Sequence, residues 1–276
     1  MGQLTDKIAL VTGGAKGLGR FYSLALAEAG ADIAIFDLGD GHRDAEPGYP
    51  LGTQADLDEV VSLIKARGQR AVSLTGDVRN QSDLDLAVST AVKNFGKIDI
   101  VVANAGIAMM GRAWEMSREE WDLLIGINLT GVWQTCKAVI PHMIEQQYGR
   151  IVLISSCIAL KGWEQLAPYA ATKRAVIALA ETLAMELAPH NITINTLAPS
   201  TVDSGTNRGL ALKHGLAWDN LVGGWLDTQA IKHLVEPQDM LSSLNKLLSR
   251  RMISLCRCVN MKSPILKVTM FNLLVI

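Results

Sequence analysis

The stretch that decides the fold is Lys7-Ile-Ala-Leu-Val-Thr-Gly-Gly-Ala-Lys-Gly-Leu-Gly19, near the start of the chain. A short apolar run typical of a buried strand comes first, and closely spaced glycines and a helix-like segment follow it. Glycines let the backbone approach a pyrophosphate closely, and the helix N-terminus offers free N–H groups and the positive end of its dipole. This stretch predicts a dinucleotide-binding turn made by Gly13, Lys16, Gly17, Leu18 and Gly19.

The second predicted strand ends on an acid that bears on the choice of dinucleotide. Asp37 lies 18 residues after Gly19. A carboxylate there accepts hydrogen bonds from the ribose hydroxyls and repels a 2′-phosphate, which favours NAD over NADP. Lys16 points the other way, because a base in the turn can bind that phosphate, and it keeps NADPH-dependent carbonyl reduction as an alternative. We weigh Asp37 more heavily, because the repulsion between its carboxylate and a 2′-phosphate disfavours NADP binding more than the attraction of a mobile surface lysine favours it.

A second group of polar residues suggests proton transfer. Tyr169 and Lys173 are an i,i+4 pair, so their side chains share one face of a helix. An ammonium beside a phenol is expected to move the tyrosine pKa from about 10 towards neutrality, where the phenol exchanges a proton with an alcohol oxygen. This spacing is common by chance, and its weight comes from the company of Ser156, thirteen residues upstream, and Asn128.

Strand-like and helix-like segments alternate along most of the chain. We expect strands at 7–12, 31–37, 71–76, 98–103, 150–156 and 192–198, and helices near 18–29, 54–67, 82–95, 117–147 and 169–189. The strands are almost continuously apolar, which suits a parallel sheet covered on both faces. The pattern predicts one doubly wound α/β domain of the Rossmann type, with its ligand crevice at the carboxyl ends of the strands. Residues at or just beyond such ends are Gly13, Asp37, Asp77, Asn104, Ser156 and Pro199.

Taken together, these residues resemble the short-chain dehydrogenase/reductase family from about Thr5 to about Met240. Five motifs match in the family's order: Thr12–Gly19 as T-G-x-x-x-G-x-G, Asp77-Val78, Asn104-Ala105-Gly106, the Y-x-x-x-K pair of Tyr169 and Lys173, and Asn128 with Ser156, which complete the catalytic tetrad. The resemblance implies an oxidoreductase that moves a hydride between NAD and an alcohol or its ketone. It also implies that Asp77 and Val78 contact adenine and that Asn104, Ala105 and Gly106 line the cofactor.

The resemblance assigns a role to each member of the tetrad. Tyr169 as phenolate takes the hydroxyl proton, and Lys173 keeps the tyrosine acidic and binds the nicotinamide ribose. Ser156 holds the substrate oxygen, and Asn128 anchors a water in a proton relay. After the sixth strand the family shows Pro-Gly where this chain has Pro199-Ser200, and Val202 and Ser204 align with residues that meet the nicotinamide amide or the pyrophosphate.

An insertion after Asp37, residues 38–50, resembles the carveol-dehydrogenase-like branch of the family, also called mycofactocin-coupled. Trp114, Trp121 and the Asn128–Trp133 segment add to that resemblance. It implies that the insertion folds over the adenosine end and retains NAD, whereas its Gly, Pro and Asp content alone predicts a mobile surface loop. Both alternatives stay open, with His42 and Tyr49 as candidates to pack over adenine.

The substrate walls are expected from 107–110, 160–163 and a substrate loop at about 200–235. Candidate apolar and aromatic lining residues are Met109, Met110, Trp163, Trp218 and Trp225. Such a lining fits a hydrophobic or cyclic secondary alcohol. The alternative is that about half of these residues only fill the core.

Beyond about Met240 the chain departs from the family pattern. We therefore divide it into a cofactor-binding domain, 1–250, and an atypical C-terminal segment, 251–276, whose change of character resembles a shifted reading frame. The apolar end, 265–276, is a candidate edge strand. If it does not dock, sheet edge and assembly are compromised, and the protein is a cofactor-binding but catalytically impaired relative.

Composition narrows the function classes further. With 26 basic and 27 acidic residues the chain has no charge excess that predicts nucleic acid or anionic lipid as a partner. We find no signal peptide and no apolar run of about 18 residues, so we expect a cytoplasmic protein without a membrane span. The four cysteines lack metal-ligand spacing, which predicts reduced thiols and no metal. The family resemblance implies a homo-oligomer, a tetramer, which the C-terminus puts in question.

Overall fold

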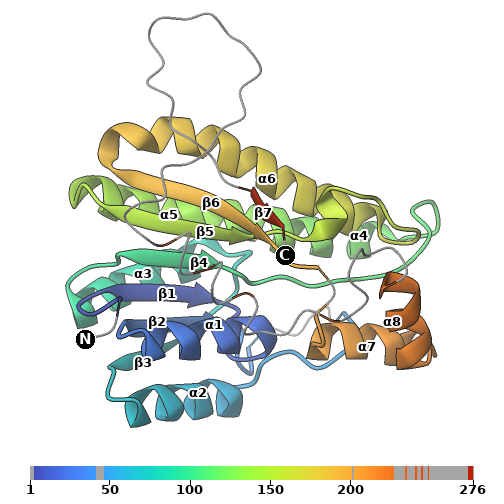
Figure 1. The fold of residues 1–276 in the computed structure, drawn as a ribbon, viewed down its shortest axis with the longest axis horizontal. Helices are drawn as coiled ribbons and strands as arrows, with labels where there is room; N and C mark the ends of the chain where they lie inside the picture. The colour runs from blue at the N-terminus through green and yellow to red at the C-terminus, as the bar shows by residue number, and fades with distance from the viewer. Residues whose placement is uncertain are drawn as a thin grey trace, which may run out of the picture.

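The computed structural model describes residues 3–41, 47–200, 202–226, 234, 240, 244, 248 and 273–275. Within these ranges the chain forms a parallel sheet of seven strands in the order β3-β2-β1-β4-β5-β6-β7 (Figure 1). The strands are β1 Ile8–Thr12, β2 Asp32–Asp37, β3 Ala71–Thr75, β4 Ile100–Ala103, β5 Gly149–Ile154, β6 Ile192–Ala198 and β7 Leu273–Val275. The strand order reverses between β1 and β4, so the predicted doubly wound fold is confirmed.

Helices cover both faces of this sheet. The helices are α1 Gly17–Glu28, α2 Gln54–Ala66, α3 Gln81–Phe95, α4 Arg118–Ile125, α5 Gly131–Glu145, α6 Ala167–Leu187, α7 Gly205–Lys213 and α8 Trp218–Leu226, with short 3-10 turns Cys157–Ala159 and Ala188–His190. One buried cluster packs α3, α5 and α6 on one face, and a second packs α1 and α2 on the other. Met240, Leu244 and Leu248 join the second cluster at helical spacing.

The observed bounds differ from the predicted ones by a residue or two, and β4 shows why. The apolar run was expected to start the strand at 98, but β4 begins at Ile100. Asp99 is buried because its carboxylate accepts the Ile8 N–H at 3.0 Å and ion pairs with Lys7 and Lys97. A carboxylate anchored between two strands in this way displaces the start of the regular ladder.

The helix expected over 117–147 is interrupted in its middle. A π-helical turn, Gly126–Thr130, separates α4 from α5. By length and composition alone, Arg118–Glu145 holds an 18-residue window apolar enough to cross a membrane, the one such helix among the described residues. Because 56% of this window is buried inside the fold and α5 packs on the sheet, we read it as a core helix.

The C-terminal segment contributes an edge strand. Leu273–Val275 pairs in parallel with β6, with Leu273 opposite Thr196 and Val275 opposite Ala198 (Figure 1). The predicted edge strand is therefore confirmed for these three residues. The rest of 251–276 lies outside the described residues, as do His42 and most of 227–250.

Candidate active site

One cavity of about 420 Å³ lies at the carboxyl ends of the strands, beneath α7. It brings together most of the residues predicted to bind cofactor or substrate. Those lining it are Gly13, Lys16, Gly17, Leu18, Asp37, Asp77, Val78, Asn104, Ala105, Gly106, Ser156, Tyr169, Lys173, Pro199, Val202 and Ser204. Gly19 and Asn128 do not line the cavity and act from behind it. The topology places this crevice where a doubly wound sheet binds its ligand.

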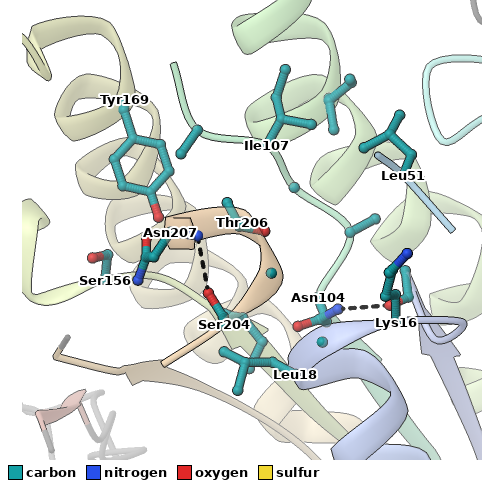
Figure 2. A pocket seen from close by; sticks show the side chains of 18 of the residues that line it. Lys16, Leu18, Leu51, Asn104, Ile107, Ser156, Tyr169, Ser204, Thr206 and Asn207 are labelled. Carbon is teal, nitrogen blue, oxygen red and sulfur yellow. Dashed lines mark hydrogen bonds between the residues drawn. The ribbon is translucent and has the colours of Figure 1, made fainter. Parts of the chain in front are cut away.

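The glycine turn is shaped by two close approaches of the backbone. Gly13 has φ of 65°, and a Cβ there would lie 2.8 Å from the Ala105 Cα; a Cβ on Gly19 would lie 1.9 Å from the Gly13 carbonyl oxygen. Asn104 ties the turn to β4, because its Nδ2 donates to the Thr12 and Gly13 carbonyls (Figure 2). Gly17 has φ of 54°, and no heavy atom lies within 4 Å of the position that a Cβ would take there. Helix α1 begins there without a side-chain cap, so its first N–H groups are free for an anion such as a pyrophosphate.

Asp37 lies at the next strand end with acceptor capacity to spare. Its carboxylate accepts the Ala15 and Leu38 N–H groups, each at 2.8 Å. The Gly39 N–H also hydrogen-bonds this carboxylate, so about one of its four lone-pair sites remains for a hydroxyl donor. Burial raises the pKa of this carboxyl, and the backbone N–H groups oppose that rise. Together with the open helix N-terminus, this donor and acceptor set fits the pyrophosphate and ribose of a dinucleotide.

The base in the turn is engaged elsewhere. The Lys16 ammonium lies 3.9 Å from an Asp56 carboxylate oxygen at the start of α2, and its side chain is half exposed. Asp56 itself closes a capping box with Thr53. The geometry agrees with a solvated surface lysine rather than with a base held ready for a 2′-phosphate.

Asp77 and Val78, predicted to contact adenine, both line the cavity. The Asp77 carboxylate accepts the Arg79 backbone N–H at 2.8 Å with one oxygen, and its other oxygen accepts hydrogen bonds from both the Nε and the Nη2 of the Arg79 guanidinium. Val78 packs against Gly131, where an added Cβ would lie 2.7 Å from a Val78 methyl. The acid is thus fixed in position by its own loop.

The proposed catalytic side chains meet at the other end of the cavity. Figure 2 shows the Tyr169 hydroxyl pointing towards Ser156, and the two form a hydrogen bond. Ser155, the neighbouring hydroxyl, instead donates to the Lys173 carbonyl at 2.7 Å. The Lys173 Nζ lies 5.7 Å from the centre of the Tyr169 ring and donates to the Ile154 carbonyl at 2.9 Å.

The expectation that Lys173 makes Tyr169 acidic is wrong for this structure. Burial raises the pKa of Tyr169 to about 12, and the Ser156 hydrogen bond only partly offsets that rise. Burial also lowers the pKa of Lys173 to about 8. Desolvation disfavours both the Tyr169 phenolate and the Lys173 ammonium, and it outweighs the attraction between them. The i,i+4 spacing reveals the attraction but not the desolvation.

Asn128 lies in the π-helical turn and is fully buried. Its amide oxygen accepts the Ile107 N–H and its nitrogen donates to the Ile107 carbonyl, both at 2.8 Å. A side chain used in this way holds the loop after β4 and does not reach substrate.

The segment after β6 leads into α7. Ser200 has no positive φ, so serine in place of glycine is accommodated without strain. Ser204 caps α7 by accepting the Asn207 N–H (Figure 2). The Val202 carbonyl, expected to meet a carboxamide, accepts the Asn207 side chain at 2.8 Å. Asn207 was not anticipated, and it lines the cavity close to Tyr169 and Ser156.

The substrate walls differ in part from those expected. Trp163 lines the cavity, but Met109, Met110 and Trp218 do not, and the Trp225 side chain lies outside what the structure describes. Met109 fills a core cluster, and Trp218 stacks under the Arg208 guanidinium. Leu210 lines the cavity from within the expected 200–235 loop, whereas the apolar lining residues outside the expected walls are Leu51, Leu123, Ile127 and Leu166.

Tyr49, a candidate to pack over adenine, lines the cavity. It is buried against Ala108 and Leu210, and Tyr169 packs on the same cluster. The Tyr49 hydroxyl accepts the Ala108 N–H at 2.9 Å. Gly52, in the same segment, lies against the Asp37 carboxylate, so residues 47–52 cross the cavity from the ribose end to the catalytic end.

A sequence profile described as short chain dehydrogenase matches residues 7–214. The chain belongs to this family. The (-)-trans-carveol dehydrogenase of Rhodococcus erythropolis is 40% identical over 206 residues, which are 74% of each chain. The crystal structure of a carveol dehydrogenase from Mycobacterium avium in complex with NAD has a TM-score of 0.81 at 31% identity, covering 90% of this chain and 91% of that one.

A solved structure whose name gives a different substrate is also similar to this chain. An NAD⁺-bound xylitol dehydrogenase superposes with a TM-score of 0.80 at 27% identity, over 90% of this chain and 94% of that chain. The predicted family, its carveol-dehydrogenase-like resemblance and the assignment as an alcohol dehydrogenase or ketone reductase are confirmed. The roles of individual residues stay predictions.

Proposed function

We propose that the chain oxidises hydrophobic or cyclic secondary alcohols, or reduces their ketones, with NAD as the hydride carrier and Tyr169 as the acid and base. The observation that carries the proposal is the shared cavity. It joins the Tyr169–Ser156 hydroxyl pair at one end to Asp37 and the open N-terminus of α1 at the other. One ligand spanning both ends brings a reacting carbon to the phenol.

The residues that would hold NAD are the glycine turn and Asp37 at the adenosine half, with Lys173, Val202 and Ser204 at the nicotinamide half. When bound, NAD supplies the hydride acceptor, and the protein supplies position and electrostatics. Asp37 accepts ribose hydroxyls and disfavours a 2′-phosphate, which is the basis for NAD over NADP. The NAD-bound relatives support this choice.

Proton transfer falls to Tyr169. Its raised pKa keeps the phenol protonated near neutral pH, so it is ready to donate to a ketone oxygen during reduction. Oxidation requires the phenolate and is favoured as the pH rises. The Ser156 hydroxyl lowers the pKa of Tyr169 and holds the substrate oxygen while negative charge develops on it.

The substrate class rests on the apolar walls. Leu123, Ile127, Trp163, Leu166 and Leu210 surround the few polar groups that converge at Tyr169. Such a site selects by shape and excludes water from a hydrophobic ring system. Two relatives named carveol dehydrogenase support a cyclic alcohol.

Steady-state turnover tests the proposal. Purified protein is given NAD or NADP with a panel of cyclic secondary alcohols and polar polyols, and formation of the reduced cofactor is followed. Oxidation of cyclic alcohols with NAD supports it, while a preference for polyols or for NADP overturns the substrate or cofactor assignment. Release of bound cofactor before the assay, together with an artificial electron acceptor, distinguishes a retained NAD from an exchanging one.

The alternatives lose support on specific contacts. Lys16, the basis for NADPH-dependent reduction, leans towards Asp56. The catalytically impaired alternative rested on an undocked C-terminus, yet Leu273–Val275 pairs with β6. Absence of turnover with every alcohol and ketone would restore it. A homotetramer, to be measured by light scattering, and a cytoplasmic location, to be measured by cell fractionation, remain predictions of the family resemblance.

A further inference from the structure

The segment 47–52, which enters α2, touches the substrate end of the cavity as well as the cofactor end. Its Tyr49 side chain is only 5% exposed and belongs to a buried cluster with Ala108 and Leu210. Tyr169 packs against that cluster. We propose that Tyr49 is a wall of the substrate site that limits the size of the alcohol accepted, an inference that rests on the proposed function.

The Tyr49 hydroxyl fixes one side of this wall. It accepts the Ala108 N–H at 2.9 Å and donates to the Ala108 carbonyl at 3.3 Å. The Asn128 side chain likewise accepts the Ile107 N–H and donates to the Ile107 carbonyl. Two consecutive residues of the loop after β4 are thus held by side chains from distant parts of the chain. Ile107 and Leu51 face the same cavity as Tyr169 (Figure 2), so this loop cannot retreat to admit a larger ligand without breaking buried hydrogen bonds.

Helix α7 fixes the other side. A Cβ on Gly209 would lie 2.4 Å from the Tyr49 Cβ, so the helix reaches this distance only because residue 209 has no side chain. The Thr206 side chain hydrogen-bonds the Tyr49 phenol, and the Lys213 ammonium donates to the Pro47 carbonyl at 3.0 Å. Thr206, Gly209 and Lys213 of α7 therefore all contact segment 47–52.

Tyr49 is an inert wall rather than a second acid. Burial raises its pKa, and its hydroxyl is already engaged by Ala108 and Thr206. Its aromatic ring, by contrast, occupies volume beside Tyr169 that a substrate ring could use. Removing the ring enlarges the cavity, whereas adding a methyl group behind it at Gly209 pushes it inward.

These two changes predict opposite shifts in substrate choice. For Tyr49→Ala, the ratio of kcat/KM for a bulky bicyclic alcohol to that for cyclohexanol should rise about tenfold or more, since even one methylene in an apolar pocket discriminates by about 10- to 200-fold. For Gly209→Ala the same ratio should fall. Tyr49→Phe retains the ring and should keep the ratio within about threefold, while loss of the phenol speeds hydrogen exchange at the Ala108 amide.

Leu212→Ala is the matched control, since Leu212 is 82% exposed on the same helix and does not line the cavity. A uniform loss of activity in Tyr49→Ala and Gly209→Ala with the ratio unchanged would overturn the proposal and leave Tyr49 a structural residue. If the native protein oxidises neither alcohol, the proposed function fails. In that case calorimetry measures the affinities of the native protein and the variants for the two corresponding ketones. If the ratio of the two affinities is the same in the variants as in the native protein, or if neither ketone binds, the proposal that Tyr49 limits substrate size is overturned.

Discussion

Burial of Lys173 makes a quantitative prediction about stability. Lys173 is 4% exposed, and its Nζ donates to the Ile154 carbonyl at 2.9 Å. Its pKa falls from 10.5 to about 8 in the folded chain. Each pKa unit corresponds to about 1.4 kcal/mol, so holding this lysine charged inside the fold costs about 3 kcal/mol below pH 8.

The direction of the effect follows from proton counting. Between pH 8 and 10.5 the folded state binds fewer protons at Lys173 than the unfolded state does, so this group raises the free energy of unfolding as the pH rises through that window. Below pH 8 both states are protonated and the full penalty remains. Lys173→Met removes the titration but leaves the Ile154 carbonyl without its donor, a loss of about 1 kcal/mol.

Urea denaturation of the native chain and Lys173→Met at pH 7 and pH 10, at one protein concentration and matched cofactor content, measures this difference. We compare the free energy of unfolding of the native chain with that of the variant at each pH. The native-minus-variant difference should be about 2 to 3 kcal/mol larger at pH 10 than at pH 7. A difference that stays constant, or that moves in the opposite direction, would refute the reasoning that desolvation dominates at Lys173.

Three further predictions concern the cofactor and the reaction. Asp37→Ser should raise the KM for NAD about tenfold or more and narrow the preference over NADP, because the ribose acceptor and the charge that repels a 2′-phosphate are both lost; steady-state kinetics with each cofactor checks this. Ser156→Ala should lower kcat by about 10²- to 10³-fold and shift the alkaline rise of the oxidation rate to higher pH, since its hydrogen bond lowers the pKa of Tyr169; a pH–rate profile would show it. Gly19→Ala should abolish NAD binding measured by calorimetry, because the new Cβ would lie 1.9 Å from the Gly13 carbonyl oxygen.

Sequence predicted the parts of the site that depend on backbone periodicity. A strand, a glycine turn and a helix occur in register at the start of the chain, and each strand end placed its polar residue where expected. These features are local, and the parallel sheet then brings them to one edge. That is why Asp37, Asn104 and Tyr169 line one cavity although the chain between them is long.

What sequence did not predict depends on long-range packing. The position of Tyr49 beside Tyr169 depends on Gly209, 160 residues away, which makes room for it. The pKa of Tyr169 was expected to fall because the i,i+4 lysine was visible, whereas the burial that raises it depends on the whole fold. Asn207 belongs to a helix that has no periodic apolar signal, and its place in the cavity follows only from the capping of α7 by Ser204.

The most direct test of the account is the turnover of Tyr169→Phe with NAD and a cyclic secondary alcohol, compared with Tyr148→Phe. Tyr148 precedes β5 at the opposite end of the strand from Ser156 and serves as the control. The account predicts that Tyr169→Phe loses about 10²- to 10⁴-fold in kcat while its NAD affinity and the activity of the control stay unchanged. A Tyr169→Phe enzyme that retains kcat within a few fold of the native protein would contradict the assignment of Tyr169 as the acid and base.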